Sequence, residues 1–218
     1  LFNNDGGRFA INSTTGVVTV AGAINRETDG PVRSITVRAT SADGSTNDTV
    51  FNINVIDVNE FAVTAPVDTN PAVNQVNENA VIGTTVGITA SASDADATTN
   101  GVTYSLDDNA GGRFAIHSAT GIVIVADGSL LDHEQATTHS IQVRATSLDG
   151  STAVRNFTIQ IGDLNDTPPV IVPNQQFSVS ELAMIGTSVG NVVATDADTV
   201  GTPQNWTITG GNVDGIFS

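Results

Sequence analysis

The chain has 218 residues, with 7 basic residues against 23 acidic ones and a formal net charge of −16. This acidic excess argues against binding to nucleic acid or to anionic membranes, because both need clustered basic side chains. There is no cysteine, which excludes disulfides and thiolate metal sites. No apolar run approaches the roughly 18 residues of a membrane-spanning helix, so no membrane insertion is expected in this segment.

Taken in chain order, the sequence repeats itself. GGRFAINSTTG at 6–16 returns as GGRFAIHSATG at 111–121, and VNENAVIGTTVG at 76–87 returns as VSELAMIGTSVG at 179–190. The period is about 105 residues, the size of one small domain. We therefore predict three units. These are the C-terminal half of a repeat at 1–61, a complete repeat at 62–166, and the N-terminal half of a third at 167–218.

The complete repeat is predicted to consist of β-strands. Short segments rich in Val, Ile, Thr and Phe are separated by Gly, Asn and Asp. Ile141, Val143 and Ala145 alternate with polar residues, which gives one buried face. About seven such strands in about 105 residues predict an all-β fold of tandem Greek-key sandwiches of immunoglobulin-like kind. The clearest predicted strands are 101–106, 121–126, 139–146 and 157–161.

Acidic residues gather where one repeat would meet the next. Loops at the two ends of a sandwich alternate along the chain, so more than half of the acidic residues converge on two junctions. The first would hold Glu27, Asp57, Glu60, Asp94, Asp96 and Asp149. The second would hold Glu78, Asp132, Glu134, Asp163, Asp166, Asp196 and Asp198.

These carboxylates predict a metal ion. Two of them about 4 Å apart repel each other by on the order of several kcal/mol in a partly desolvated site. Hard oxygen ligands in this number, without His or Cys, suit calcium, whereas magnesium keeps more water and fewer protein ligands. The sequence therefore predicts calcium (Ca²⁺) at both junctions.

The motifs VNENA, DAD, LDHE, SLDG and DLNDTPP resemble, in this order, the calcium motifs of cadherin repeats. The resemblance covers the whole chain and implies cadherin-like β-sandwiches with calcium at the junctions. It adds main-chain carbonyls to the predicted ligands, from Val58 and Asn59 at the first junction and from Leu164 and Asn165 at the second. Asn25 stands where the family has Asp, and Phe61 and Thr167 stand where it has Asn. We therefore expect the first junction to be the less complete.

Other chemistry has little support. His117, His133 and His139 align with Asn12, Arg26 and Arg33 in the first copy, so they are predicted to be exposed surface residues. No nucleophile elbow, phosphate-binding loop or H-E-x-x-H motif occurs, and the DADATTNG stretch lacks the closing Glu of an EF-hand. The chain is therefore expected not to be an enzyme.

The function expected from the resemblance is a calcium-rigidified spacer or adhesive rod in cell–cell, surface or matrix adhesion. Low Lys, abundant Thr, Asn, Asp and Gly, and no Cys resemble bacterial adhesins, which implies a secreted or cell-surface setting. Expected partners are calcium, neighbouring repeats of the same or like chains, and a cell-surface protein or glycan. Two alternatives stay open at this point: a carbohydrate-binding accessory module of a secreted enzyme, and a subunit of a head-to-tail extracellular filament.

Overall fold

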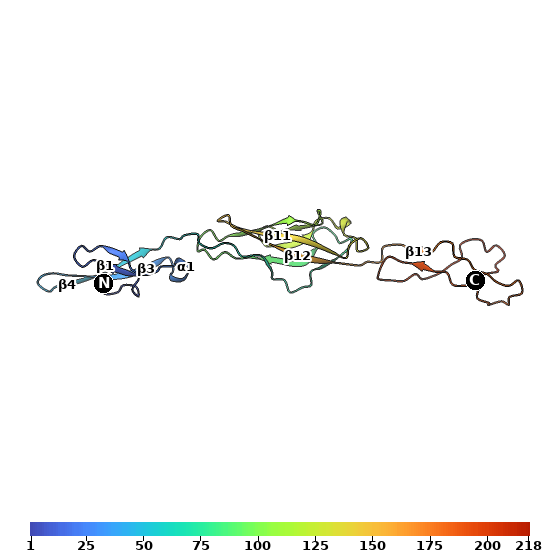
Figure 1. The fold of residues 1–218 in the computed structure, drawn as a ribbon, viewed down its shortest axis with the longest axis horizontal. Helices are drawn as coiled ribbons and strands as arrows, with labels where there is room; N and C mark the ends of the chain where they lie inside the picture. Colours follow the sequence, from blue (N-terminus) through green and yellow to red (C-terminus); the bar gives the residue numbers. More distant parts are fainter.

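The computed structural model describes residues 1–218, and its strands fall into three groups along one long axis (Figure 1). The first group contains two antiparallel hairpins. One joins β1 (Phe9–Ile11) to β2 (Val18–Val20), and the other joins β3 (Val32–Thr40) to β4 (Thr46–Asn54). A four-residue helix, α1 (Arg26–Asp29), lies between the hairpins in the sequence.

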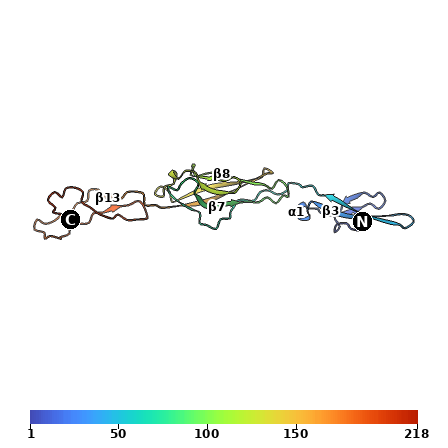
Figure 2. The same ribbon diagram turned by 180° about the vertical axis from the view of Figure 1, so that it is seen from behind.

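The middle group is a sandwich of two four-stranded sheets. One sheet has the order β5-β7-β10-β9 and the other β6-β12-β11-β8. A view from behind shows β7 and β8 in this sandwich (Figure 2). The strands are β5 (Val67–Asp68), β6 (Gln75–Asn77), β7 (Thr85–Ser91), β8 (Val102–Asp108), β9 (Phe114–Ile116), β10 (Ile122–Val125), β11 (Thr138–Ser147) and β12 (Thr152–Gly162). A single 3-10 turn, η1 (Gly128–Leu130), follows β10.

The first strand of the sandwich is divided between the two sheets. β5 pairs antiparallel with β7, and the chain then crosses to the other sheet, where β6 pairs parallel with β12. The β6–β12 pair therefore places the end of the first strand beside the end of the last strand. This arrangement brings Glu78, which follows β6, next to the connector that leaves β12.

The core of the sandwich follows the predicted alternation. Ile141, Val143 and Ala145 on β11 are fully buried, and Ile159 and Ile161 on β12 are buried with them. The four larger side chains, Ile141, Val143, Ile159 and Ile161, pack between the sheets with residues such as Phe114 and Val123. The predictions of an all-β fold and of this buried face are confirmed.

The strands of the first group match only the second half of the sandwich. Some apolar side chains that are buried in the middle repeat are therefore exposed in the first group. Val20 is 67% exposed, whereas Val125 at the same place in the repeat is 0% exposed. Val125 is covered because β7 pairs with β10 and packs over the core. Residues 1–61 contain no counterpart of β7.

The third group has one short antiparallel pair, β13 (Val170–Ile171) with β14 (Ala194–Thr195). Met184 and Ile185 are exposed there, as are Val81 and Ile82 at the same place in the middle repeat. The only α-helix, α1, has four residues and is far too short to span a membrane.

Candidate metal centres at the two junctions

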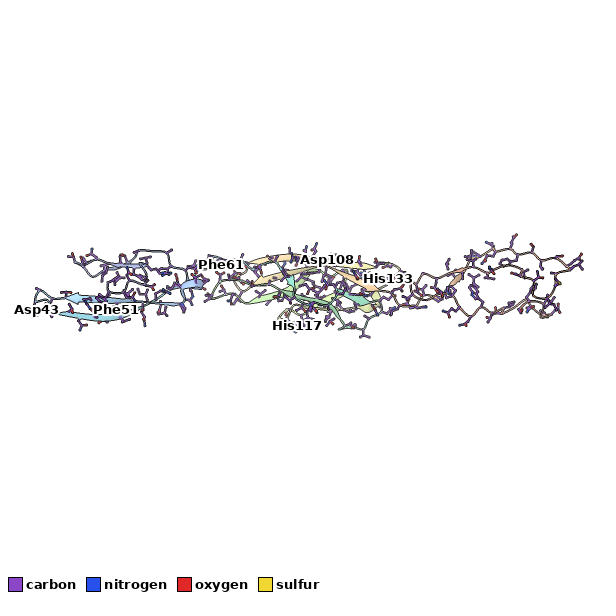
Figure 3. All side chains as sticks on the ribbon, turned by 90° about the horizontal axis from the view of Figure 1, so that it is seen from below. Asp43, Phe51, Phe61, Asp108, His117 and His133 are labelled. Carbon is purple, nitrogen blue, oxygen red and sulfur yellow. The ribbon has the colours of Figure 1, made fainter.

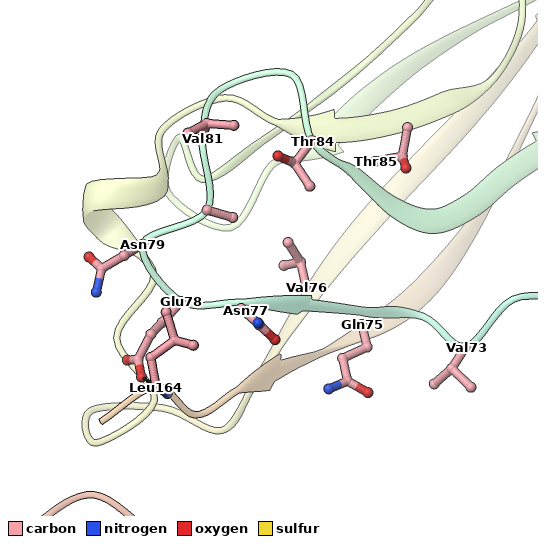
Figure 4. Close-up of a pocket in the computed structure, with 11 residues that line it drawn as sticks. Val73, Gln75, Val76, Asn77, Glu78, Asn79, Val81, Thr84, Thr85 and Leu164 are labelled. Atoms are coloured by element: carbon pink, nitrogen blue, oxygen red, sulfur yellow. Dashed lines mark hydrogen bonds between the residues drawn. The ribbon is translucent and has the colours of Figure 1, made fainter. Parts of the chain in front are cut away.

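Glu78 organises the second junction, which we define as the connector 163–167 and the acidic residues around it. The residue is 1% exposed and lies at the end of β6 beside Leu164 (Figure 4). One carboxylate oxygen accepts a hydrogen bond from the main-chain N–H of His133 at 2.6 Å, and the other accepts one from Leu164 at 2.7 Å. One carboxylate thus joins the first strand, the turn before β11 and the connector.

The connector is also bonded to the repeat that follows it. Oδ2 of Asp163 accepts hydrogen bonds from the Thr199 N–H at 2.5 Å and from the Thr199 hydroxyl. In return, the Thr167 N–H donates to Asp198 at 3.1 Å. These hydrogen bonds therefore hold a carboxylate of the connector, Asp163, near a carboxylate of the third repeat, Asp198.

Two groups of three carboxylates form here. Glu78, Glu134 and Asp163 have oxygens within 4.8 Å of one another, and so do Glu134, Asp166 and Asp198. Burial raises the pKa of Glu134, and the nearby carboxylates of Glu78, Asp163 and Asp198 raise it further. A cavity of about 160 Å³ opens beside these groups and is lined by Glu78, Asp132, Glu134 and Asp166 among others.

The first junction, the connector 57–61 with its acidic neighbours, uses the same bonding scheme. Oδ2 of Asp57 accepts hydrogen bonds from the Thr98 N–H at 2.8 Å and from its hydroxyl. Oδ1 of Asp96 accepts bonds from the N–H groups of Glu60 and Phe61 at 3.2 and 3.3 Å. Each connector thus has an aspartate bonded to a threonine of the next repeat, and its own N–H groups bonded to a DAD aspartate.

The carboxylates of the first junction form one group of three: Asp94, Asp96 and Asp149 have oxygens within 4.8 Å of one another. The Ser151 hydroxyl lowers the pKa of Asp149, and so does the Ser151 N–H, which donates a hydrogen bond to Asp149 at 2.7 Å. Burial raises the pKa of Glu60, and so do the charges of Glu27, Asp96 and Asp57. The acidic residues predicted to meet at the first junction are therefore close enough to shift the pKa of Glu60.

The donor atoms fit a hard cation. Eight buried side-chain N or O atoms have no hydrogen-bond partner, and six of them are carboxylate oxygens of predicted ligands. A buried anionic oxygen without a partner is costly, and a metal ion removes that cost. The six are both oxygens of Glu27, Oδ2 of Asp94, Oδ2 of Asp96, Oδ1 of Asp163, and Oδ1 of Asp57, which has no hydrogen bond but lies 3.6 Å from the Arg26 Nε.

The other predicted ligands lie in the same loops but outside the three carboxylate groups. Asp132 accepts a hydrogen bond from the Gln135 N–H at 2.7 Å, and Asp196 accepts one from Asp198 at 3.3 Å. The carbonyl oxygens predicted as ligands accept no hydrogen bond, which leaves them free for a metal ion. They belong to Val58, Asn59, Leu164 and Asn165.

The prediction that all three histidines are exposed is wrong for two of them. His117 is exposed, but His133 and His139 are half-buried. His133 lies at the end of the middle repeat that faces the third, opposite the end marked by Phe61 (Figure 3). Its Nδ1 lies 2.8 Å from the Ile161 carbonyl oxygen, and this contact raises the pKa of His133. Burial follows because each ring packs against a neighbouring element, which alignment of the repeats does not show.

Sequence reasoning also missed the residues that hold the ligands. Thr98 and Thr199 bind the first aspartate of each connector, and the Asn79 side chain donates to Asp166 at 2.5 Å. One signal was available for the threonines, because both follow a DAD motif within four residues.

Besides the carboxylate groups of the junctions, the surface has a second cavity and seven basic residues. The larger cavity, about 620 Å³, runs along β6, and Glu78 is the only ionisable residue that lines it. All seven basic residues are arginines. Arg113 and Arg155 donate to main-chain carbonyls, and the other five form ion pairs: Arg8–Asp29, Arg26–Asp57, Arg33–Asp5, Arg38–Asp48 and Arg144–Asp107.

Comparison with known proteins identifies the repeat. The family model described as Cadherin domain matches residues 73–161. Protocadherin Fat 2 of Rattus norvegicus is 34% identical over 98% of this chain, and Cadherin-23 of Homo sapiens is 34% identical over 91%. The chain spans only 5% and 6% of the length of these two relatives.

Solved structures agree with the family match. The crystal structure of mouse Cadherin-23 EC22-24 has a TM-score of 0.67 and 26% sequence identity, covering 88% of this chain and 62% of that one. Mouse Protocadherin-24 EC1-3 has a TM-score of 0.66 and 25% identity, covering 88% and 64%. The relatives are cadherins and protocadherins, in agreement with the expectation that the chain is not an enzyme.

Proposed function

We propose that this chain, a tandem of cadherin-like β-sandwiches, binds calcium at both junctions and is a calcium-stiffened segment of an extracellular adhesion protein. The observation that carries the proposal is the six buried carboxylate oxygens without a hydrogen-bond partner, five at the first junction and one, Oδ1 of Asp163, at the second. Calcium at these oxygens would neutralise the repulsion between them. Because Asp166 lies in the connector and Asp198 in the next repeat, an ion bound there would also fix the angle between repeats.

The proposed ligands are the predicted carboxylates and carbonyls of the two junctions. Glu78 and Asp96 would change least on binding, because the hydrogen bonds already described hold them in place. The proposed repeat boundaries are 1–61, 62–166 and 167–218. The cadherin match at 73–161 lies within the middle unit.

The test is calcium titration of the chain with small-angle X-ray scattering. We expect the maximum dimension to lengthen and its distribution to narrow as calcium is added, and both changes to reverse with a chelator. Asp166→Asn should reduce the response while the far-ultraviolet circular dichroism of the sandwich stays unchanged. Identical scattering with and without calcium would refute the proposal.

The setting is a further part of the proposal. The relatives named above are animal proteins and do not support a bacterial origin, which rests only on the composition without Cys or Lys. Adhesion itself is supported by the kinship with cadherins and protocadherins. No observation favours carbohydrate binding. The chain has one Tyr and one Trp, and the Tyr104 ring packs against the core.

A further inference from the structure

The two junctions differ at the residue that begins the turn containing the proposed Glu ligand, Glu27 or Glu134. At the first junction this residue is Asn25, whose Oδ1 accepts hydrogen bonds from the Thr28 N–H at 2.8 Å and the Thr28 hydroxyl at 2.9 Å. At the second junction it is Asp132, whose Oδ1 accepts a bond from the Gln135 N–H at 2.7 Å. Each side chain therefore uses one oxygen to cap the turn.

The side-chain atoms that stay free after capping differ between Asn25 and Asp132. Asn25 has no second oxygen, and its remaining group is an NH₂ donor that cannot bind a cation. Asp132 keeps a second carboxylate oxygen, and the residue lines the cavity of about 160 Å³ with Glu78, Glu134 and Asp166. At this position the second junction thus has one more anionic oxygen than the first, although five of the six buried carboxylate oxygens without a hydrogen-bond partner lie at the first junction.

A fixed positive charge adds to the difference. Nε of Arg26 lies 3.6 Å from Oδ1 of Asp57, and the two side chains are 23% and 10% exposed. At the same place in the second junction, His133 contacts the Ile161 carbonyl rather than a carboxylate. Arg26 therefore offsets part of the negative charge at the first junction and repels a calcium ion there.

The positions of the carboxylate groups also favour tighter calcium binding at the second junction. The group Glu134–Asp166–Asp198 draws on the middle repeat, the connector and the third repeat. The group Asp94–Asp96–Asp149 draws on the middle repeat alone. An ion bound by Glu134, Asp166 and Asp198 would therefore link two repeats directly.

We propose that the junctions bind calcium with unequal affinity, the second more tightly than the first, and that the Asn25/Asp132 difference sets a large part of the gap. This inference rests on the proposed calcium function and adds the order in which the two junctions bind calcium. As free calcium rises, the joint at 163–167 stiffens first and the joint at 57–61 follows. Over an intermediate range of calcium the segment has one stiff and one loose joint.

The test uses limited proteolysis of the 218-residue chain over a series of buffered free calcium concentrations. A protease that cleaves after Glu and Asp can cut the first connector after Asp57 or Glu60 and the second after Asp163 or Asp166, and fragment masses tell them apart. We expect the second connector to become protected at lower calcium than the first. Asn25→Asp should lower the midpoint of the first connector by about tenfold, because calcium affinity follows ligand charge. Asp132→Asn should raise the midpoint of the second.

Asn12→Asp is the matched control. Asn12 also caps a turn with Oδ1, accepting bonds from the N–H groups of Thr14 and Thr15, but it lies in the β1–β2 turn and in neither junction. It should leave both midpoints unchanged. Equal midpoints in the parent chain, or a first-connector midpoint that Asn25→Asp does not move, would overturn the inference while leaving the calcium function intact. No protection of either connector by calcium would instead refute the calcium function itself.

Discussion

His139 shows how one exchanged residue changes the chemistry of a repeat. Its counterpart in the first repeat, Arg33, is paired with Asp5 at 2.5 Å. His139 instead packs edge-on against Phe114, with ring centroids 6.3 Å apart, and its Nε2 is buried without a partner. Burial lowers the pKa of His139, and the positive charge of Arg113 lowers it further.

This environment predicts a pH dependence of stability. Because the folded-state pKa lies below the ordinary value of 6.5, the unfolded chain takes up the proton first as pH falls. The stability due to neutral His139 is therefore complete above pH about 6.5 and is lost between that pH and the lowered folded pKa. We expect His139→Phe to reduce the loss of stability between pH 7 and pH 5, measured by urea unfolding in chelator.

His117 provides the comparison, since it is exposed in the β9–β10 turn. His117→Phe should leave the slope of stability against pH as it is in the parent chain. Equal slopes for the parent chain and His139→Phe would show that the buried ring does not titrate on unfolding.

Among the elements, β7 makes a close backbone contact with the chain just before β6, at Gly87. A Cβ built on Gly87 would lie 2.2 Å from the Val73 carbonyl oxygen, and Gly87 has φ +82°. Gly83, just before β7, has φ +89° but no atom within 4 Å of such a Cβ. The two glycines therefore separate backbone strain from steric overlap.

We predict that Gly83→Ala lowers the free energy of unfolding by about 1–2 kcal/mol, the cost of a left-handed conformation for an L residue. Gly87→Ala should lower it by about 2–5 kcal/mol, because overlap with the chain before β6 is added to the strain. Thermal unfolding of both variants measures the difference. Equal losses would mean that the chain at Val73 moves aside at no cost.

The elements also show what the sequence can and cannot predict. Strands such as β11 and β12 were predictable because Ile141, Val143 and Ile159 follow a period of two. The acidic groups were predictable because loops at the two ends of a sandwich alternate. The hydrogen bonds from Thr98 and Thr199 were not, since they depend on how one repeat sits on the next. Nor was the capping role of Asn25, which requires the short helix α1 to exist.

For the whole molecule, the core is concentrated in one unit. The twelve residues of the main core cluster all lie between Val76 and Ile161. Residues 1–61 contribute Phe9 and Ile35 as buried apolar side chains. The middle repeat therefore has, within residues 62–166, the burial that a stable domain needs.

This distribution predicts the behaviour of fragments. A fragment of residues 62–166 should unfold cooperatively in urea with a free energy of about 5 kcal/mol or more. A fragment of residues 1–61 should show no cooperative transition, because half a sandwich leaves its apolar face in water. Circular dichroism and amide hydrogen exchange of the two fragments test this, and protected amides throughout 1–61 would contradict it.

The parallel pairing of β6 with β12 has a mechanical consequence. A pull along the long axis enters the middle repeat beside its first strand and leaves it from its last, and these two strands run in the same direction side by side. Such a load slides one strand along the other, so the hydrogen bonds between them must break together rather than one after another. Forced unfolding depends on the height of that barrier rather than on equilibrium stability. We therefore expect the hydrogen bonds between β6 and β12 to set the resistance of the middle repeat to tension.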